Sequence, residues 1–174
     1  LVGASLNHLG VVRYKLEQMN VRFETDGAVL HVRRDEPLKP INIITDTYPG
    51  FATDLQSPMM AVACLANGTS YIHERIFDGR FNLAGELNKM GANVEVNGSR
   101  AIVYGPTPLT GTEVTAHDLR SGIALVLAGL AAEGETLISP GYLIDRGHAY
   151  LAERMQALGA HVVREISPDG ETPS

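Results

Sequence analysis

The sequence predicts an α/β fold made of a repeated unit in which helices alternate with strands. An apolar pattern over residues 83–94 recurs over residues 12–23 and again over residues 151–162. Self-similarity of this kind is the signature of a repeated supersecondary unit. Strands that alternate with helices are typical of parallel crossover connections. We therefore expect one domain with about two and a half copies of the unit.

Each copy of the pattern predicts an amphipathic helix followed by a strand. Apolar residues recur at i, i+4 and i+7, which places them on one helical face. The helices are expected to end at Asn20, Gly91 and Gly159, because these residue types tolerate the left-handed backbone after a last helical turn. In the third copy the following strand would contain Val162 and Val163.

Tight hairpins are predicted after the first two copies. The dipeptides Asp26-Gly27 and Asn97-Gly98 favour the positive φ angles of a short turn, and strand-forming segments follow over residues 28–32 and 101–104. The third copy has no such return, because residues 166–174 are polar and rich in turn formers. The third unit should therefore be incomplete.

The first helix of the unit is duplicated as well. Asp54 and Asp118 each open an apolar run that ends at Gly68 or Gly134, which predicts two largely buried helices. Both aspartates are candidate N-caps. Pro58 is compatible with the first turn of its helix, where its missing N–H has no helical partner.

Short strands are expected after these helices, over residues 69–72 and 135–138. The full unit then reads strand, helix, strand, helix, strand, strand. These elements predict a single domain over 1–166, with a partial unit at 1–40, a full unit at 41–105, a truncated unit at 106–166, and a polar tail at 167–174.

The composition argues against several classes of protein. With 174 residues and 44% apolar content, the chain can bury one sizeable core. Its net charge of −6 disfavours nucleic acid as a partner. A single cysteine excludes an internal disulfide, and no apolar run is long enough for a leader or a bilayer span. We expect a cytoplasmic protein without a membrane segment.

Signatures of cofactors and metals are missing from the sequence. It contains neither G-x-G-x-x-G nor G-x-x-x-x-G-K-[ST], so no cofactor is expected. No histidine is paired with a cysteine or an acid at metal-ligand spacing, so no metal is expected. The scattered histidines are His8, His31, His73, His117, His148 and His161.

Three arginines are expected at helix starts: Arg80, Arg120 and Arg146. A cation in a first helical turn is unfavourable unless it faces a negative group. One interpretation is that each arginine pairs with its acidic neighbour in the sequence. The alternative is that they bind a small dianionic substrate, since arginine recognises phosphate and carboxylate groups through two hydrogen bonds at once. The neighbouring acids are Asp78, Asp118 and Asp145.

Asp54 is a candidate general base. It follows a turn-forming segment, so its carboxylate would lie at the end of a strand and the start of a helix. An N-cap is the simpler role for this residue. If Thr53 caps the helix instead, Asp54 is free to accept a proton from a substrate hydroxyl.

Several segments are specific in combination. They are YPGFATDLQ over residues 48–56, IFDGRF over 76–81, LNKMGA over 87–92, DLR over 118–120 with LAG over 127–129, and IDRG over 144–147 with LGA over 158–160. Together they resemble the UDP-N-acetylglucosamine enolpyruvyl transferase family over about residues 5–166. Members of that family fold as inside-out α/β barrel domains of repeated units, with buried helices and sheets outside, which implies the same fold class here.

The resemblance also implies a reaction, the first committed step of bacterial peptidoglycan synthesis. Asp54 would take the proton from the 3-hydroxyl of UDP-N-acetylglucosamine as this hydroxyl attacks phosphoenolpyruvate. Arg120 and Arg146 would hold the phosphate and carboxylate of phosphoenolpyruvate. These three are the expected catalytic residues.

Further contacts to the substrates are implied in the same way. Arg80 would lie near the same anion or steady a closed active-site loop. The backbone around Ile76 and Phe77 would contact the nucleotide sugar, and Asp118 would orient Arg120.

The chain matches only the later half of that family's sequences. The unmatched half carries the loop whose cysteine or aspartate is the general acid. Cys64 lies within an apolar helical segment, so we expect an inert packing residue rather than a substitute for that acid. The chain alone is therefore expected to be inactive. Its open strand edge should be covered by the missing N-terminal half or by self-association.

Two alternatives stay open. The sister family transfers the enolpyruvyl group to shikimate 3-phosphate on the same architecture, although the segments at 118–120 and 144–146 favour the nucleotide-sugar branch. A catalytically silent anion-binding or scaffold module would keep the arginines and act through a partner. The length of the upstream reading frame would distinguish that module from an enzyme.

Overall fold

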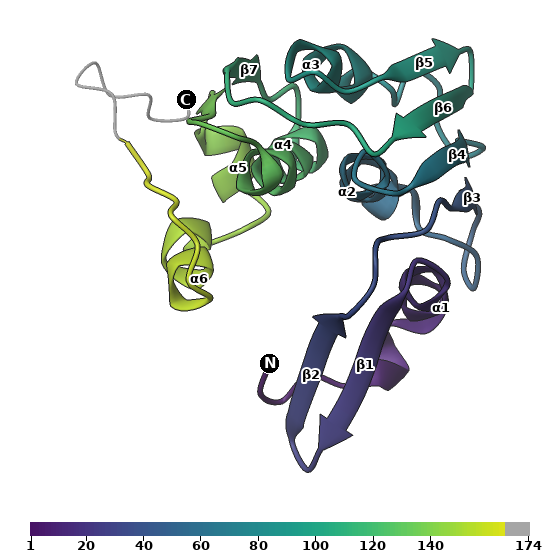
Figure 1. Ribbon diagram of the computed structural model, residues 1–174, viewed down its shortest axis with the longest axis vertical. Coiled ribbons are helices and arrows are strands. Elements are labelled where there is room, and N and C mark those ends of the chain that lie inside the picture. Colours follow the sequence, from purple (N-terminus) through teal and green to yellow (C-terminus); the bar gives the residue numbers. More distant parts are fainter. Residues whose placement is uncertain (166–174) are drawn as a thin grey trace.

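The computed structural model describes residues 1–165, and these residues form small sheets outside a group of buried helices (Figure 1). This arrangement confirms the predicted inside-out α/β fold class. The domain and unit boundaries drawn from the sequence stay a prediction. The predicted polar tail, 167–174, lies outside the described residues.

The central part of the chain follows the predicted order of strand, helix, strand, helix, strand, strand. Its elements are β3 (Asn42–Ile44), η2 (Thr53–Leu55), α2 (Gln56–Ala63), β4 (Gly68–His73), α3 (Leu83–Lys89), β5 (Val94–Asn97) and β6 (Arg100–Gly105). They build one sheet of order β3-β4-β6-β5, in which β3 and β4 are parallel and the other neighbours antiparallel. Parallel β3 and β4 bring their carboxyl ends to the same edge, where the candidate site lies.

Two helices form the middle of the core, α2 and α4 (Leu119–Ala131), and they pack against each other. Helix α4 contains several alanine and glycine residues, and α2 contributes the small residues Ala61 and Ala63, which allows close approach. A Cβ at Gly122 would come within 2.5 Å of Ile144, so only glycine leaves room for the segment that packs there. Figure 1 shows both helices on the inner side of the four-stranded sheet.

The N-terminal part consists of η1 (Leu6–His8), α1 (Gly10–Gln18), β1 (Val21–Asp26) and β2 (Val29–Arg34). The two strands pair as an antiparallel hairpin, which projects from the rest of the molecule in Figure 1. The turn residues are Gly27 and Ala28, one position later than predicted, because the glycine takes the positive φ of 57° at the first turn position. The second hairpin shows the same offset at Gly98.

The C-terminal part contains β7 (Glu113–Thr115) before α4, and β8 (Leu137–Ser139), α5 (Tyr142–Asp145) and α6 (Leu151–Ala157) after it. Strands β7 and β8 are parallel, so this part repeats the first half of the central unit. The strand predicted around Val162 and Val163 is wrong: residues 158–165 contain no strand, since no returning strand follows them among the described residues.

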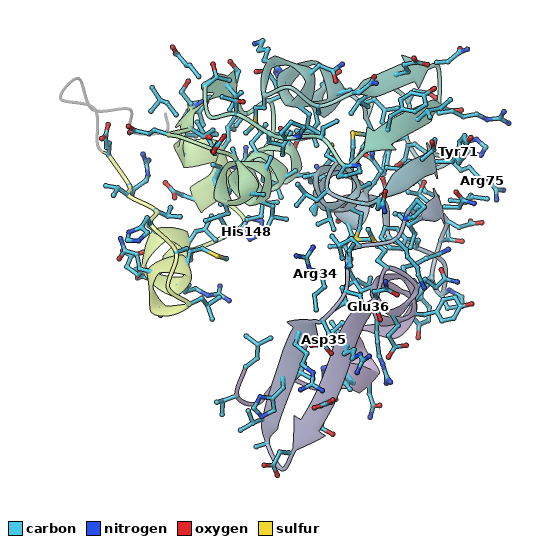
Figure 2. All side chains as sticks on the ribbon, in the orientation of Figure 1. Arg34, Asp35, Glu36, Tyr71, Arg75 and His148 are labelled. Atoms are coloured by element: carbon cyan, nitrogen blue, oxygen red, sulfur yellow. The ribbon has the colours of Figure 1, made fainter. Side chains whose placement is uncertain are left out.

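The predicted helix ends are confirmed. Asn20, Gly91 and Gly159 all have positive φ directly after their helices, at 72°, 93° and 90°. The outer sheet face carries exposed side chains such as Tyr71, which Figure 2 shows on the side away from α2 and α4. Within residues 1–165, no helix is both long and apolar enough to cross a membrane.

Candidate active site

Three charged side chains from separate segments meet at one point. Asp54 lies in η2, Arg80 in the turn before α3, and Arg120 in the first turn of α4. Arg120 Nε donates to Asp54 Oδ1 at 2.5 Å, and Arg80 Nη1 lies 3.5 Å from the same oxygen. The Asp54 side chain is 67% exposed, whereas those of Arg80 and Arg120 are 15% and 26% exposed. A ligand could therefore reach the Asp54 carboxylate from solvent and replace it as the partner of the two largely buried guanidinium groups.

The start of α4 fixes the position of Arg120. Asp118 is the N-cap: one of its oxygens accepts from the backbone N–H groups of Arg120 and Ser121, both at 2.8 Å. Ser121 completes a capping box by accepting from the Asp118 N–H through its hydroxyl oxygen. The other carboxylate oxygen of Asp118 lies 3.8 Å from Arg120 Nη1. Asp118 thus holds both the backbone and the side chain of Arg120.

Asp54 is not an N-cap, which corrects the simpler of the two sequence interpretations. Neither η2 nor α2 has a side-chain cap, and Ala52 and Leu55 occupy the cap positions. The Asp54 carboxylate instead points to Arg80 and Arg120, because two cations attract it more strongly than a short helix start. Thr53 does not cap either; its hydroxyl donates to Glu74 at 2.9 Å.

The arginines control the protonation of Asp54. The hydrogen bond from Arg120 is the largest cause that lowers the pKa of this carboxyl group, and partial burial opposes it. The charge of Arg120 and the contact with Arg80 lower the pKa further. Asp54 is therefore a carboxylate at neutral pH, the form that a base requires.

Arg80 is held by an aromatic ring. Its guanidinium carbon lies 4.2 Å from the centre of the Phe77 ring, a cation–π distance. Its ion pair is with Asp54 and not with the neighbouring Asp78, so the local-pairing interpretation is wrong for this residue. Arg80 also precedes α3 in a turn and does not belong to the first turn of that helix.

Arg146 does not join the cluster directly. It follows α5 as its C-cap, not as the start of a helix, and its side chain is exposed. Among residues 1–165, no side-chain hydrogen bond or ion pair involves it, and the neighbouring Asp145 pairs with Arg164 at 3.0 Å. A Cβ on Gly147 would lie 3.1 Å from Leu119, so the Arg146 backbone lies beside the start of α4.

Glu74 is a residue that sequence reasoning missed. It follows β4 and is only 2% exposed, although glutamate is rarely buried. Its carboxylate accepts from the hydroxyls of Thr45 and Thr53 at 2.8 and 2.9 Å. It also accepts from the backbone N–H groups of Ile76 and Phe77 at 2.8 and 3.2 Å. Only its place at a strand end, next to the IFDGRF segment, could have indicated a role.

These four hydrogen bonds keep Glu74 ionised. Burial is the largest influence and raises the pKa of its carboxyl group, but the four donors together outweigh burial and the net shift is downward. In the loop after β4, the N–H groups of Ile76 and Phe77 are already used by Glu74 and are not free to donate to a ligand, while the Phe77 ring is half-exposed.

The described residues contain no group of three or more histidine, cysteine, aspartate or glutamate side chains that could hold a metal ion. Cys64 is fully buried at the end of α2, and burial raises the pKa of its thiol to about 12. Its position is that of the packing residue expected from the sequence.

Comparisons with known proteins all find enolpyruvyl (carboxyvinyl) transferases. The sequence pattern of the family described as EPSP synthase (3-phosphoshikimate 1-carboxyvinyltransferase) matches residues 1–155. A UDP-N-acetylglucosamine 1-carboxyvinyltransferase from Thermobifida fusca is 65% identical over 95% of this chain. A protein of the same name from Koribacter versatilis is 45% identical over 96% of the chain. The chain spans 39% of the length of each of these curated relatives.

Solved structures show the same fold. The enolpyruvyl transferase NikO from Streptomyces tendae has a TM-score of 0.84 and 29% identity, with coverage of 96% of this chain and 40% of that one. The EPSP synthase from Acinetobacter baumannii has a TM-score of 0.65 at 17% identity, covering 90% of this chain and 37% of its own, and supports the fold alone.

Proposed function

Because the chain belongs to the EPSP synthase (3-phosphoshikimate 1-carboxyvinyltransferase) family, we propose that the complete protein is an enolpyruvyl transferase that uses UDP-N-acetylglucosamine. It moves the enolpyruvyl group of phosphoenolpyruvate to the sugar 3-hydroxyl and releases phosphate. The product would be the first committed intermediate of peptidoglycan, made in the cytoplasm for cell-wall growth and division. The curated relatives with 65% and 45% identity carry the name of this nucleotide-sugar activity.

The convergence of Asp54, Arg80 and Arg120 is the observation that carries this proposal. Two guanidinium groups face one carboxylate, and all three come from different elements of the fold. A transferring trianion needs fixed positive charge, and an attacking hydroxyl needs a base. The cluster supplies both within one hydrogen-bonded group.

The reaction divides into addition and elimination. In the first step Asp54 accepts the proton of the sugar 3-hydroxyl while the 3-oxygen forms a bond to C2 of phosphoenolpyruvate. C3 receives a proton from a general acid outside this chain. In the second step the bond from C2 to the phosphate oxygen breaks, and C3 returns a proton to the conjugate base of that general acid. Asp54 passes its proton to the departing phosphate or to solvent. Phosphate leaves, and the carbon–carbon double bond forms again.

The arginines have a second task in this scheme. In the structure Asp54 is engaged by Arg120, and the bound anion would compete for that guanidinium. When phosphoenolpyruvate takes Arg120, Asp54 loses the interaction that most lowers the pKa of its carboxyl group and becomes a stronger base. Binding of one substrate thus activates the base for the other.

Arg146 and the loop after β4 complete the proposed site. Arg146 is exposed beside the start of α4, and in the proposed site its side chain would turn toward an anion bound at Arg120. The carbonyl groups of Ile76 and Phe77 would face the nucleotide sugar, and Asp118 orients Arg120 through the capping box. The remaining wall of the site and the general acid would belong to the N-terminal half of the protein.

The experiment that tests the proposal is a product assay with the complete protein. Phosphate release is measured from phosphoenolpyruvate with UDP-N-acetylglucosamine or with shikimate 3-phosphate, and the mass of each product is determined. The proposal requires phosphate release and a carboxyvinyl adduct with the nucleotide sugar only. Turnover with shikimate 3-phosphate would favour the sister activity, and turnover with neither would favour the silent binding module.

A further inference from the structure

We propose that Glu74 is a positioning residue that fixes the base Asp54 and the loop of Ile76 and Phe77 relative to each other. The inference rests on the proposed function of Asp54. It assigns a task to a buried charged group that neither binds the substrate nor belongs to the cluster of Asp54, Arg80 and Arg120.

The Glu74 carboxylate lies where two parallel strands end. Glu74 directly follows β4, and Thr45 directly follows β3, so their hydrogen bond joins the carboxyl ends of two parallel strands. The Thr45 N–H also donates to the His73 carbonyl at 2.9 Å, which continues the strand pairing to this point. The carboxylate is thus anchored to the paired carboxyl ends of β3 and β4.

The anchored carboxylate holds segments on both sides of the site. Its Oε2 accepts from the hydroxyl of Thr53, the residue immediately before Asp54. Its Oε1 accepts from the N–H groups of Ile76 and Phe77, and the Phe77 ring lies against the Arg80 guanidinium. One buried side chain therefore sets the backbone on both sides of the Asp54–Arg80 pair.

Burial of a charged glutamate at this position costs free energy. A buried carboxylate requires nearly complete hydrogen bonding, because an unsatisfied charge in a protein interior is strongly unfavourable. A hydrophobic side chain at this strand end would fill the space without that requirement. It could not hold two hydroxyl and two amide groups at fixed directions, which a site built from loops needs.

Thr53→Val tests the hydrogen bond between Thr53 and Glu74 with the least disturbance of the fold. It removes one hydroxyl from a half-buried position and keeps the shape of the side chain. In the complete protein we expect kcat to fall about tenfold or more, since small displacements of a catalytic group are costly. KM for phosphoenolpyruvate should change little. Thr53→Ser keeps the hydroxyl and should restore kcat to within about threefold of the parent.

Thr107→Val is the matched control. Thr107 is also half-buried and donates its hydroxyl, to the Cys64 carbonyl at 3.2 Å, at the opposite end of α2 from Asp54. It should keep the parent kcat while losing a comparable hydrogen bond. Glu74→Asp is the second variant: its shorter side chain cannot reach Thr53 and the loop together, so kcat should fall and KM for the nucleotide sugar should rise.

A second readout separates this inference from the proposed function. Selective carboxyl ¹³C labelling of aspartate follows the titration of Asp54 by NMR without any turnover. If Glu74 sets the contact between Asp54 and Arg120, Thr53→Val should move the pKa of Asp54 upward toward its ordinary value, and Thr53→Ser should not. A parent protein without transferase activity would refute the proposed function, yet this titration would still test the positioning role. Unchanged kcat and unchanged Asp54 titration in Thr53→Val would overturn the inference.

Discussion

Replacing Asp54 with asparagine should abolish most turnover with little loss of stability. The carboxylate is 67% exposed and accepts from Arg120 and Arg80 at 2.5 and 3.5 Å. Exposed ion pairs contribute about 0–1 kcal/mol, so the thermal midpoint should fall by a few degrees at most. Loss of a general base costs about 10²- to 10⁴-fold in rate. The expected loss of rate is therefore much larger than the expected loss of stability, and this difference distinguishes a general base from a structural ion pair.

The assay is phosphate release by the complete protein under saturating substrates, with calorimetry of phosphoenolpyruvate binding beside it. Asp54→Asn should keep or improve that binding, because Arg80 and Arg120 lose a competing anion. Glu24→Gln is the matched control, since Glu24 is 54% exposed and pairs with Arg33 on the projecting β1–β2 hairpin. A drop in kcat of less than tenfold for Asp54→Asn, or an equal drop for Glu24→Gln, would refute the reasoning.

Three further predictions concern the arginine, the thiol and the helix cap. Arg120→Lys should lower kcat/KM at least about tenfold, because a point charge does not replace a planar fork. The same substitution should move the acid limb of the pH–rate profile to higher pH, since the hydrogen bond that most lowers the pKa of Asp54 is lost. Normal kinetics with an unshifted acid limb would contradict this prediction. Cys64, with a thiol pKa raised to about 12 by burial, should react with a thiol reagent at pH 8 only after denaturation, and rapid labelling of the native protein would count against that burial. Asp118→Ala should destabilise the fold by about 1 kcal/mol through loss of the α4 cap, and Asp118→Asn should recover most of this in a denaturant titration. Equal midpoints for the alanine variant and the parent would contradict the capping role.

The repeated architecture could be predicted because it follows from local patterns. Helix ends at Asn20, Gly91 and Gly159 need a left-handed residue, and few residue types supply one. The apolar runs after Asp54 and Asp118 had to be buried, and α2 and α4 do form the centre of the core. The predicted turn positions were wrong by one residue. A dipeptide such as Asp-Gly indicates a turn, but it does not show whether the residue before or after the glycine is the other turn residue.

The site was predictable only in part. Convergence of Arg80 and Arg120 on one carboxylate depends on how distant elements pack, and the nearest acids in the sequence are poor guides to it. The N-cap expected at Asp54 did not form for the same reason. Glu74 was missed because a glutamate after a strand is ordinarily solvated, and nothing in the local sequence indicates the four donors that surround it.

The most direct test of the account is a crystal structure of the complete protein with UDP-N-acetylglucosamine and phosphoenolpyruvate bound in an inactive variant of its general acid. We predict that an Asp54 carboxylate oxygen lies at hydrogen-bond distance, about 2.6–3.2 Å, from the sugar 3-oxygen, and that Arg120 has turned to the anion. An Asp54 still paired with Arg120 while both substrates occupy another part of the protein would contradict it.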